Sequence, residues 1–320
     1  MWLMIAVFSG CNQTKQTESI EGNWAFSLPD GNPAWLSIKK DSTAQMLWSV
    51  GSAKSIDVQS FSEDQIELAG KFGWRPYGNQ KWYNLQNPIV GELNNDGNLI
   101  LTVVHKSENE TDTFKLTGKH MPPMPPKPDL SQVRLEEPLD ILANGMQGWK
   151  LTNPDKTNGW RIEDGVLINE TPKKDFGAYG NYGNLRTLDD FEDFELTIDY
   201  NVPEEGNSGI YLRGTYEVQV VDKDSPMQGI QGPGAIFGRI KPTHNNANPG
   251  GEWNRYKITL IDRHVTVELN GETVIDNQPL EGCTGGGINA DDTKPGPVFL
   301  QGDHTSVKYK NIFIREVQSD

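Results

Sequence analysis

Short runs of alternating apolar and polar residues recur along the chain, and this alternation predicts strands that bury one face. In the first third, residues 24–28 alternate, and a turn at residues 29–33 leads into a second apolar run at 34–38. The stretch Asn94-Asn-Asp-Gly-Asn98 carries a hairpin signal directly before another apolar run. Evenly spaced short strands of this kind predict a small β-barrel or β-sandwich over residues 20–120.

Longer strands are expected in the second half of the sequence. Residues 194–200 alternate without a break, and residues 265–269 alternate and end in Asn270-Gly271, a type I′ turn signature. Alternation is weaker over residues 307–314, as in a strand that is covered on both faces. Helical periodicity is scarce, so we expect an all-β protein whose second unit, residues 132–320, is a jelly-roll or lectin-type two-sheet sandwich.

The clearest domain boundary is a proline-rich segment between these two units. Five prolines fall within residues 121–128, and proline cannot donate hydrogen bonds to a sheet and favours an extended backbone. Residues 121–131 are therefore predicted to be a stiff linker.

The amino terminus resembles a bacterial lipoprotein signal. Residues 1–8 are all apolar, and the small residues Ser9 and Gly10 stand directly before Cys11. The resemblance implies lipid modification of Cys11, a polar tether up to residue 19, and a protein anchored to a membrane in the periplasm or at the cell surface. The alternative reading is a buried apolar strand with an incidental cysteine.

Charge and cysteine content exclude two broad classes of protein. The chain has 29 Lys and Arg residues against 44 Asp and Glu residues, a net charge of −15, whereas a nucleic-acid binder needs a basic face. With only Cys11 and Cys283, a disulfide framework is also excluded. Cys283 stands in a glycine-rich stretch and is read as a lone structural thiol.

An ordered set of short phrases in the second unit resembles the 3-keto-disaccharide hydrolase domain family. Two of them are Gly206-Asn-Ser-Gly-Ile-Tyr-Leu-Arg213 and Gln301-Gly-Asp-His304; the others lie at residues 140–150, 159–167, 191–196, 216–220, 234–238, 249–254 and 310–312. The resemblance covers roughly residues 136–317 and implies a concanavalin-like sandwich in exported bacterial proteins that act on sugars. A glycine-rich insert at residues 281–297 departs from the family pattern.

Strand alternation groups the candidate site residues. Tyr211 and Arg213 share one face of a predicted strand, Glu217 and Gln219 share one face of the next, and a turn at 214–215 would join the two as a hairpin. Arg213 and Glu217 would then be neighbours. The other candidates are Asn207 between two glycines, Trp253, Asn254, Gln301 and His304.

The implied substrate, a 3-keto-glycoside, gives these residues their expected roles. A ketone at C3 makes the C2 proton acidic, so Glu217 or His304 would act as the base. Arg213 and Gln219 would stabilise the charge that develops on the C3 oxygen. Trp253 would stack on a sugar ring, while Asn207, Tyr211, Asn254 and Gln301 would contact the substrate. A divalent metal ion held by Glu217 and His304 is an alternative that the sequence leaves open.

Three alternatives remain open from the sequence alone. The protein could bind glycans without cleaving them, or it could be a structural surface lipoprotein. Arg213 and Glu217 could form no more than a structural ion pair between strands.

Overall fold

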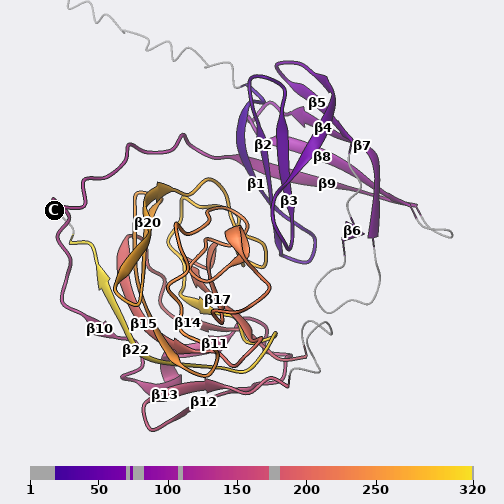
Figure 1. The fold of residues 1–320 in the computed structure, drawn as a ribbon. Coiled ribbons are helices and arrows are strands. Elements are labelled where there is room, and N and C mark those ends of the chain that lie inside the picture. The colour runs from indigo at the N-terminus through magenta and orange to yellow at the C-terminus, as the bar shows by residue number, and fades with distance from the viewer. Residues whose placement is uncertain (1–18, 70–72, 75–82, 107–110, 173–180, 319–320) are drawn as a thin grey trace, which may run out of the picture.

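The computed structural model describes residues 19–69, 73–74, 83–106, 111–172 and 181–318, which form two β-rich units (Figure 1). The all-β prediction is confirmed, because the regular elements of these residues are strands apart from the short 3-10 turns η1 (Gly145–Gly148) and η3 (Gly229–Gln231). The predicted lipoprotein signal and Cys11 lie outside the described residues. Within these ranges, no helix has both the length and the apolar character needed to span a membrane.

The first unit is a closed, up-and-down antiparallel barrel. The strands of the ring pair with their neighbours along the chain, except that the fifth strand pairs with β7, and a pairing between the first and last strands closes the ring. Its strands are β1 (Gly22–Ser27), β2 (Pro33–Ile38), β3 (Ala44–Trp48), β4 (Lys54–Phe61), β5 (Gln65–Ala69), β7 (Tyr83–Leu93), β8 (Leu99–Lys106) and β9 (Thr111–His120), with β6 (Gly73–Trp74) paired to β7. Of the two predicted architectures, the barrel is therefore the one that forms.

Large apolar side chains fill the interior of the barrel. Trp24, Phe26, Leu36 and Trp48 belong to one buried cluster that draws on most of the strands. A ring of this size is just wide enough for side chains to fill it. The alternation read from the sequence thus marks the inward face of each strand.

The second unit is a two-sheet sandwich, as predicted. One sheet has the order β12-β13-β22-β15-β18-β19-β20, with β10 paired to β22, and the other has the order β11-β14-β21-β16-β17. The larger sheet contains β10 (Leu139–Asp140), β12 (Trp160–Glu163), β13 (Val166–Asn169), β15 (Phe194–Asn201), β18 (Trp253–Ile261), β19 (His264–Leu269), β20 (Glu272–Pro279) and β22 (Val307–Glu316). The five-stranded sheet contains β11 (Trp149–Leu151), β14 (Leu185–Thr187), β16 (Asn207–Leu212), β17 (Tyr216–Val221) and β21 (Phe299–Leu300). The main apolar cluster of the unit lies between these sheets.

Local backbone geometry explains one success and one error of the sequence reading. Asn270 and Gly271 both have positive φ, 51° and 84°, as a type I′ turn between β19 and β20 requires. On β22 the weak alternation reflects an irregularity rather than burial on both faces. Tyr309 and Ile312 both face the core because Asn311, with φ of 51°, shifts the register opposite β15.

The proline-rich segment lies along the sandwich instead of standing free. The Arg263 guanidinium donates to the carbonyl oxygens of Pro122 and Pro123, and the Asn277 side-chain amide donates to Pro128. These bonds fix the path of the segment that connects β9 to β10 in Figure 1.

Candidate active site

The outer face of the five-stranded sheet gathers most of the predicted site residues. On β16 and β17, Ile210 and Val218 point into the sandwich core, so the residues next to them in sequence point outward. This places Asn207, Tyr211, Glu217 and Gln219 on the outer face, and β21 pairs with β16 so that Gln301 follows on the same side. The strand register thus brings five of the predicted site residues to one face.

Glu217 lies nearly buried at the centre of this face. It is directly opposite Tyr211, and its carboxyl group lies across Gly209, where an added Cβ would be 2.2 Å from Oε1. Only glycine leaves room for the acid in that position. Burial raises the pKa of Glu217 to about 8, although a hydrogen bond with Tyr211 partly opposes this shift. A carboxyl group with such a pKa can exchange a proton near neutral pH.

Tyr211 is held rigidly beside that acid. Its ring stacks on Phe299 with 4.3 Å between the ring centroids, and its hydroxyl donates to the Gly285 carbonyl oxygen over 3.0 Å. Burial raises the pKa of Tyr211 well above its ordinary value, so the phenol stays protonated. It is therefore a fixed neighbour of Glu217 rather than a base.

Two buried amide groups flank Glu217. The Gln219 Nε2 atom lies 3.5 Å from Asn207 Oδ1 and 3.7 Å from Met227 Sδ, which are both long for hydrogen bonds. Among the described residues, Oε1 of Gln219 and Oε1 of Gln301 have no hydrogen-bond partner. Buried acceptors without partners are costly unless a ligand satisfies them, so this face suits a hydroxyl-bearing molecule.

His304 and Asp303 form a dyad in the loop that follows β21. His304 Nδ1 lies 2.7 Å from the buried Asp303 carboxylate, which favours the tautomer with a proton on Nδ1 and orients the imidazole ring. The following residue, Thr305, accepts a hydrogen bond from the Asn207 backbone over 2.8 Å, which ties this loop to β16. Asp303 was missed as a site residue, although it stands next to His304 in the same phrase.

Arg213 does not join this group, so the prediction that it neighbours Glu217 is wrong. β16 ends at Leu212, and Arg213 begins the turn with a left-handed backbone, φ of 53°, which redirects its side chain. The guanidinium forms a buried ion pair with Asp193 and donates to the Glu192 carbonyl oxygen over 2.6 Å. Its role is to hold the turn.

Trp253 and Asn254 also lie elsewhere, on β18 of the larger sheet. Trp253 is on the outer side of that sheet, with Lys310 Nζ 4.1 Å from its ring centroid. Asn254 is buried, and its Oδ1 accepts hydrogen bonds from the Asn248 backbone and the Asn270 side chain. The predicted stacking and hydroxyl-binding roles of these two residues are therefore not compatible with a site on the five-stranded sheet.

The alternative of a metal ion between Glu217 and His304 has no structural support in the described chain. There, no group of three or more His, Cys, Asp or Glu side chains is arranged to hold a metal ion.

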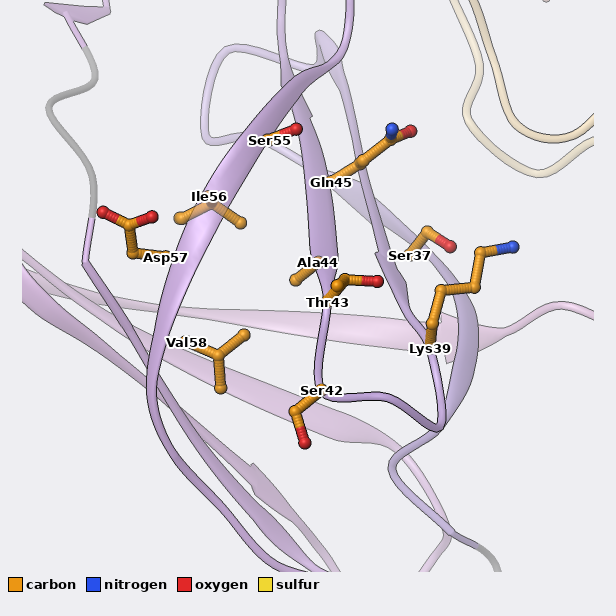
Figure 2. Close-up of a pocket in the computed structure, with 10 residues that line it drawn as sticks. All are labelled: Ser37, Lys39, Ser42, Thr43, Ala44, Gln45, Ser55, Ile56, Asp57 and Val58. Atoms are coloured by element: carbon orange, nitrogen blue, oxygen red, sulfur yellow. The ribbon is translucent and has the colours of Figure 1, made fainter.

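A hollow of about 530 Å³ lies in the barrel, where β4 separates from the β2–β3 hairpin (Figure 2). Four hydroxyl side chains, one amide, three apolar side chains, one lysine and one aspartate line it. The lining residues are Ser37, Lys39, Ser42, Thr43, Ala44, Gln45, Ser55, Ile56, Asp57 and Val58. It lacks the histidine–carboxylate dyad and the buried acid that mark the five-stranded sheet.

Comparison with known proteins identifies the second unit. The family model described as the 3-keto-alpha-glucoside-1,2-lyase-like domain matches residues 140–315. Two crystal structures of candidate glycosyl hydrolases from Parabacteroides distasonis are similar in fold. One is 28% identical, covers 62% of this chain and 94% of its own, and has a TM-score of 0.45. The other is 23% identical, covers 56% and 94%, and has a TM-score of 0.44.

A search of curated proteins gave no match. The family match carries the assignment, and it contains every residue of the outer face described above, from Asn207 to His304. Since it spans more than half of the chain, this protein belongs to the family of 3-keto-alpha-glucoside-1,2-lyase-like domains.

Proposed function

We propose that the protein cleaves the glycosidic bond of 3-keto-glycosides by elimination, followed by addition of water. The observation that carries this proposal is the outer face of the five-stranded sheet, where Glu217, with a pKa raised to about 8, lies among amide oxygens that lack partners. The family match supports glycoside chemistry in general, and the 3-keto substrate is our proposal.

Each step of the reaction needs a group of a kind that this face provides. Glu217 takes the proton from C2, and the C3 ketone accepts the resulting negative charge as an enolate oxygen. When the enolate collapses, the bond between C1 and the glycosidic oxygen breaks, and His304, oriented by Asp303, donates a proton to the leaving oxygen. Water then adds across the C1–C2 double bond and gives net hydrolysis.

The amide groups have two tasks in this scheme. The weakly bonded Nε2 of Gln219 can donate to the enolate oxygen, where a fixed donor stabilises charge as it develops. The free carbonyl oxygens of Gln219 and Gln301 can accept hydrogen bonds from sugar hydroxyls. This route differs from the two-carboxylate mechanism of ordinary glycosidases, because it passes through an enolate and not an oxocarbenium ion.

The rival function, glycan binding without cleavage, calls for an exposed aromatic platform. Among the described residues of this face, the aromatic side chains Tyr211 and Phe299 are buried and stacked on each other. A buried acid with a raised pKa and no open aromatic surface favour the enzyme.

Incubation with a 3-keto-disaccharide tests the proposal directly. We expect release of the free sugar, with a transient product that absorbs in the ultraviolet because its double bond is conjugated with the ketone. The unoxidised disaccharide serves as the control and should remain intact, since its C2 proton is not acidic. Binding of the keto sugar without any release would favour the rival function.

The pH dependence of the reaction should report the ionisation of Glu217. The base is the ionised form, so the rising limb of kcat/KM is expected to have its midpoint at about pH 8. The neighbouring phenols Tyr211 and Tyr309 have raised pKa values and remain neutral over this range. Initial rates of wild type and of Glu217→Gln between pH 5 and pH 10 would check this, and a rising limb that is absent from wild type would remove Glu217 as the base.

A further inference from the structure

The glycine-rich insert, residues 281–297, lies between the barrel and the candidate active site. One peptide group of the insert, between Gly285 and Gly286, contacts both the barrel and the candidate active site. Its carbonyl oxygen accepts the hydrogen bond from the Tyr211 hydroxyl at 3.0 Å, and its N–H donates to the Ser49 carbonyl oxygen of the barrel at 2.9 Å. A single rigid peptide plane thus connects the side chain beside Glu217 to the end of β3.

On the barrel side, the insert fits closely around Trp35. This side chain is on the outer face of β2, yet it is only 2% exposed, because the Arg239 guanidinium lies 4.2 Å from its ring centroid and Gly282 packs against its edge. A Cβ on Gly282 would lie 2.4 Å from the indole. Arg239 in turn donates to the Cys283 carbonyl oxygen, so the same residue clamps both the indole and the insert.

Further contacts between the barrel and the insert surround Trp35. Ala25, Trp35, Leu47, Met121, Cys283 and Ala290 form an apolar cluster that draws on the barrel, the start of the proline-rich segment and the insert. Lys119 at the end of β9 forms an ion pair with Asp291 at 2.7 Å. A Cβ on Gly285 would lie 2.3 Å from the Gly51 carbonyl oxygen, so the two backbones touch without space for a methyl group.

On the sandwich side, the insert is bonded to the backbone of the β16–β17 hairpin. Thr284 Oγ1 accepts the backbone hydrogen bond of Glu217 at 2.9 Å and donates to the Thr215 carbonyl oxygen at 3.1 Å. Ile288 adds a backbone hydrogen bond to Gly214. The insert therefore contacts both the Glu217 backbone and the Tyr211 hydroxyl, while its other side rests on the barrel.

We propose that the amino-terminal barrel is a working part of the active site, because it presses residues 284–286 onto the sheet and so positions Tyr211 and Glu217. Trp35 and Ser49 are positioning residues in this scheme, and they act through the insert without touching the substrate. The inference deepens the proposed function, on which its catalytic consequence rests.

Two single substitutions in the full-length protein test this role. Trp35→Ala removes the indole from the interface while leaving the barrel interior intact, since Trp35 is not part of that cluster. Gly285→Ala creates a clash with Gly51 of the barrel, and none of the close contacts of the added Cβ is with the sandwich. Gly148→Ala is the control, because its added Cβ would meet its nearest neighbour at an ordinary 3.8 Å.

Both interface variants should lower kcat about tenfold with little change in KM. In both, the pH midpoint of activity should move from about 8 toward the ordinary value for glutamate, because water reaches Glu217. A purely structural role would reduce the fraction of folded enzyme without moving that midpoint. Trp35→Phe, which retains an aromatic ring, should keep most of the wild-type rate. It provides a folded variant for comparison if Trp35→Ala folds poorly.

A second readout does not depend on catalysis. The Glu217 carboxyl can be titrated by ¹³C NMR of glutamate-labelled protein, with its signal assigned by its absence in Glu217→Gln. A lower pKa of Glu217 in Trp35→Ala and Gly285→Ala supports the positioning role even if no 3-keto sugar is cleaved, in which case only the proposed function fails. If the Glu217 pKa in both folded variants equals that of wild type, the inference is overturned.

Discussion

Glu217→Gln is expected to lower kcat for cleavage of a 3-keto-disaccharide by about 10²- to 10⁴-fold, the range that general acid–base groups contribute. Glutamine has nearly the same shape as protonated glutamate, so it should occupy the space over Gly209 and keep its contact with Tyr211. It cannot take a proton from C2. The loss should therefore fall on kcat, while KM changes little.

The fold should survive this substitution because the native side chain is already neutral over much of the pH range. Its pKa rises from 4.5 to about 8 on folding, so the contribution of Glu217 to stability is complete below pH 4.5 and is lost as the pH rises through 8. A glutamine does not ionise. The difference in free energy of unfolding between variant and wild type should therefore shift in favour of the variant as the pH is raised from 5 to 9.

Steady-state rates and urea unfolding at these two pH values would measure both effects. Glu163→Gln is the matched control, because Glu163 is an exposed carboxylate of the same sandwich and is paired only with Arg161 at the surface. Its kcat and its pH dependence should match those of wild type. A Glu217→Gln enzyme that retains more than a tenth of the wild-type rate would transfer the role of base to His304.

The part of the site that could be predicted from sequence is the part set by strand alternation. Tyr211, Glu217 and Gln219 lie on uninterrupted strands, where every second side chain faces the same side whatever the rest of the fold does. The closed barrel and the sandwich follow from the same local rule together with turn signals such as Asn270-Gly271.

The predictions failed where one backbone angle or a distant pairing decides the outcome. Arg213 continues the alternation in the sequence, but its positive φ takes it off the strand. Trp253 has a strand pattern that does not tell which sheet the strand joins, and the pairing of β18 with β15 settles it. The docking of the insert on Trp35 leaves no local pattern at all, because glycine is equally consistent with a free loop and with close packing.

Arg213→Met should destabilise the sandwich by about 3–5 kcal/mol, the usual loss when one partner of a buried ion pair is removed. Arg213 is 3% exposed, and its guanidinium is paired with Asp193 and hydrogen-bonded to the carbonyl oxygens of Glu192 and Asp292. Methionine fills much of the same volume but leaves these acceptors without a donor. Arg315→Met is the control, because its pair with Glu195 spans 3.6 Å at the surface and should matter by less than about 1 kcal/mol.

The pH dependence of this loss identifies its cause. Burial already raises the pKa of Asp193, and the charge of Arg213 opposes that rise. Without Arg213, the pKa of Asp193 in the folded state rises further. The variant therefore loses stability relative to wild type as the pH increases through that pKa. Its deficit in free energy of unfolding should be larger at pH 7 than at pH 4. Urea unfolding at both values measures this, and an equal deficit would trace the loss to packing.

The same variant separates the two roles considered for Arg213. A group that stabilised the enolate oxygen directly would cost about 10²–10³-fold in kcat when removed. Since Arg213 holds the β16–β17 turn instead, we expect the folded variant at low temperature to keep kcat within about tenfold of wild type. A much larger loss of kcat in fully folded Arg213→Met would mean that Arg213 contacts the reacting atoms. The turn would then have to rearrange when substrate binds.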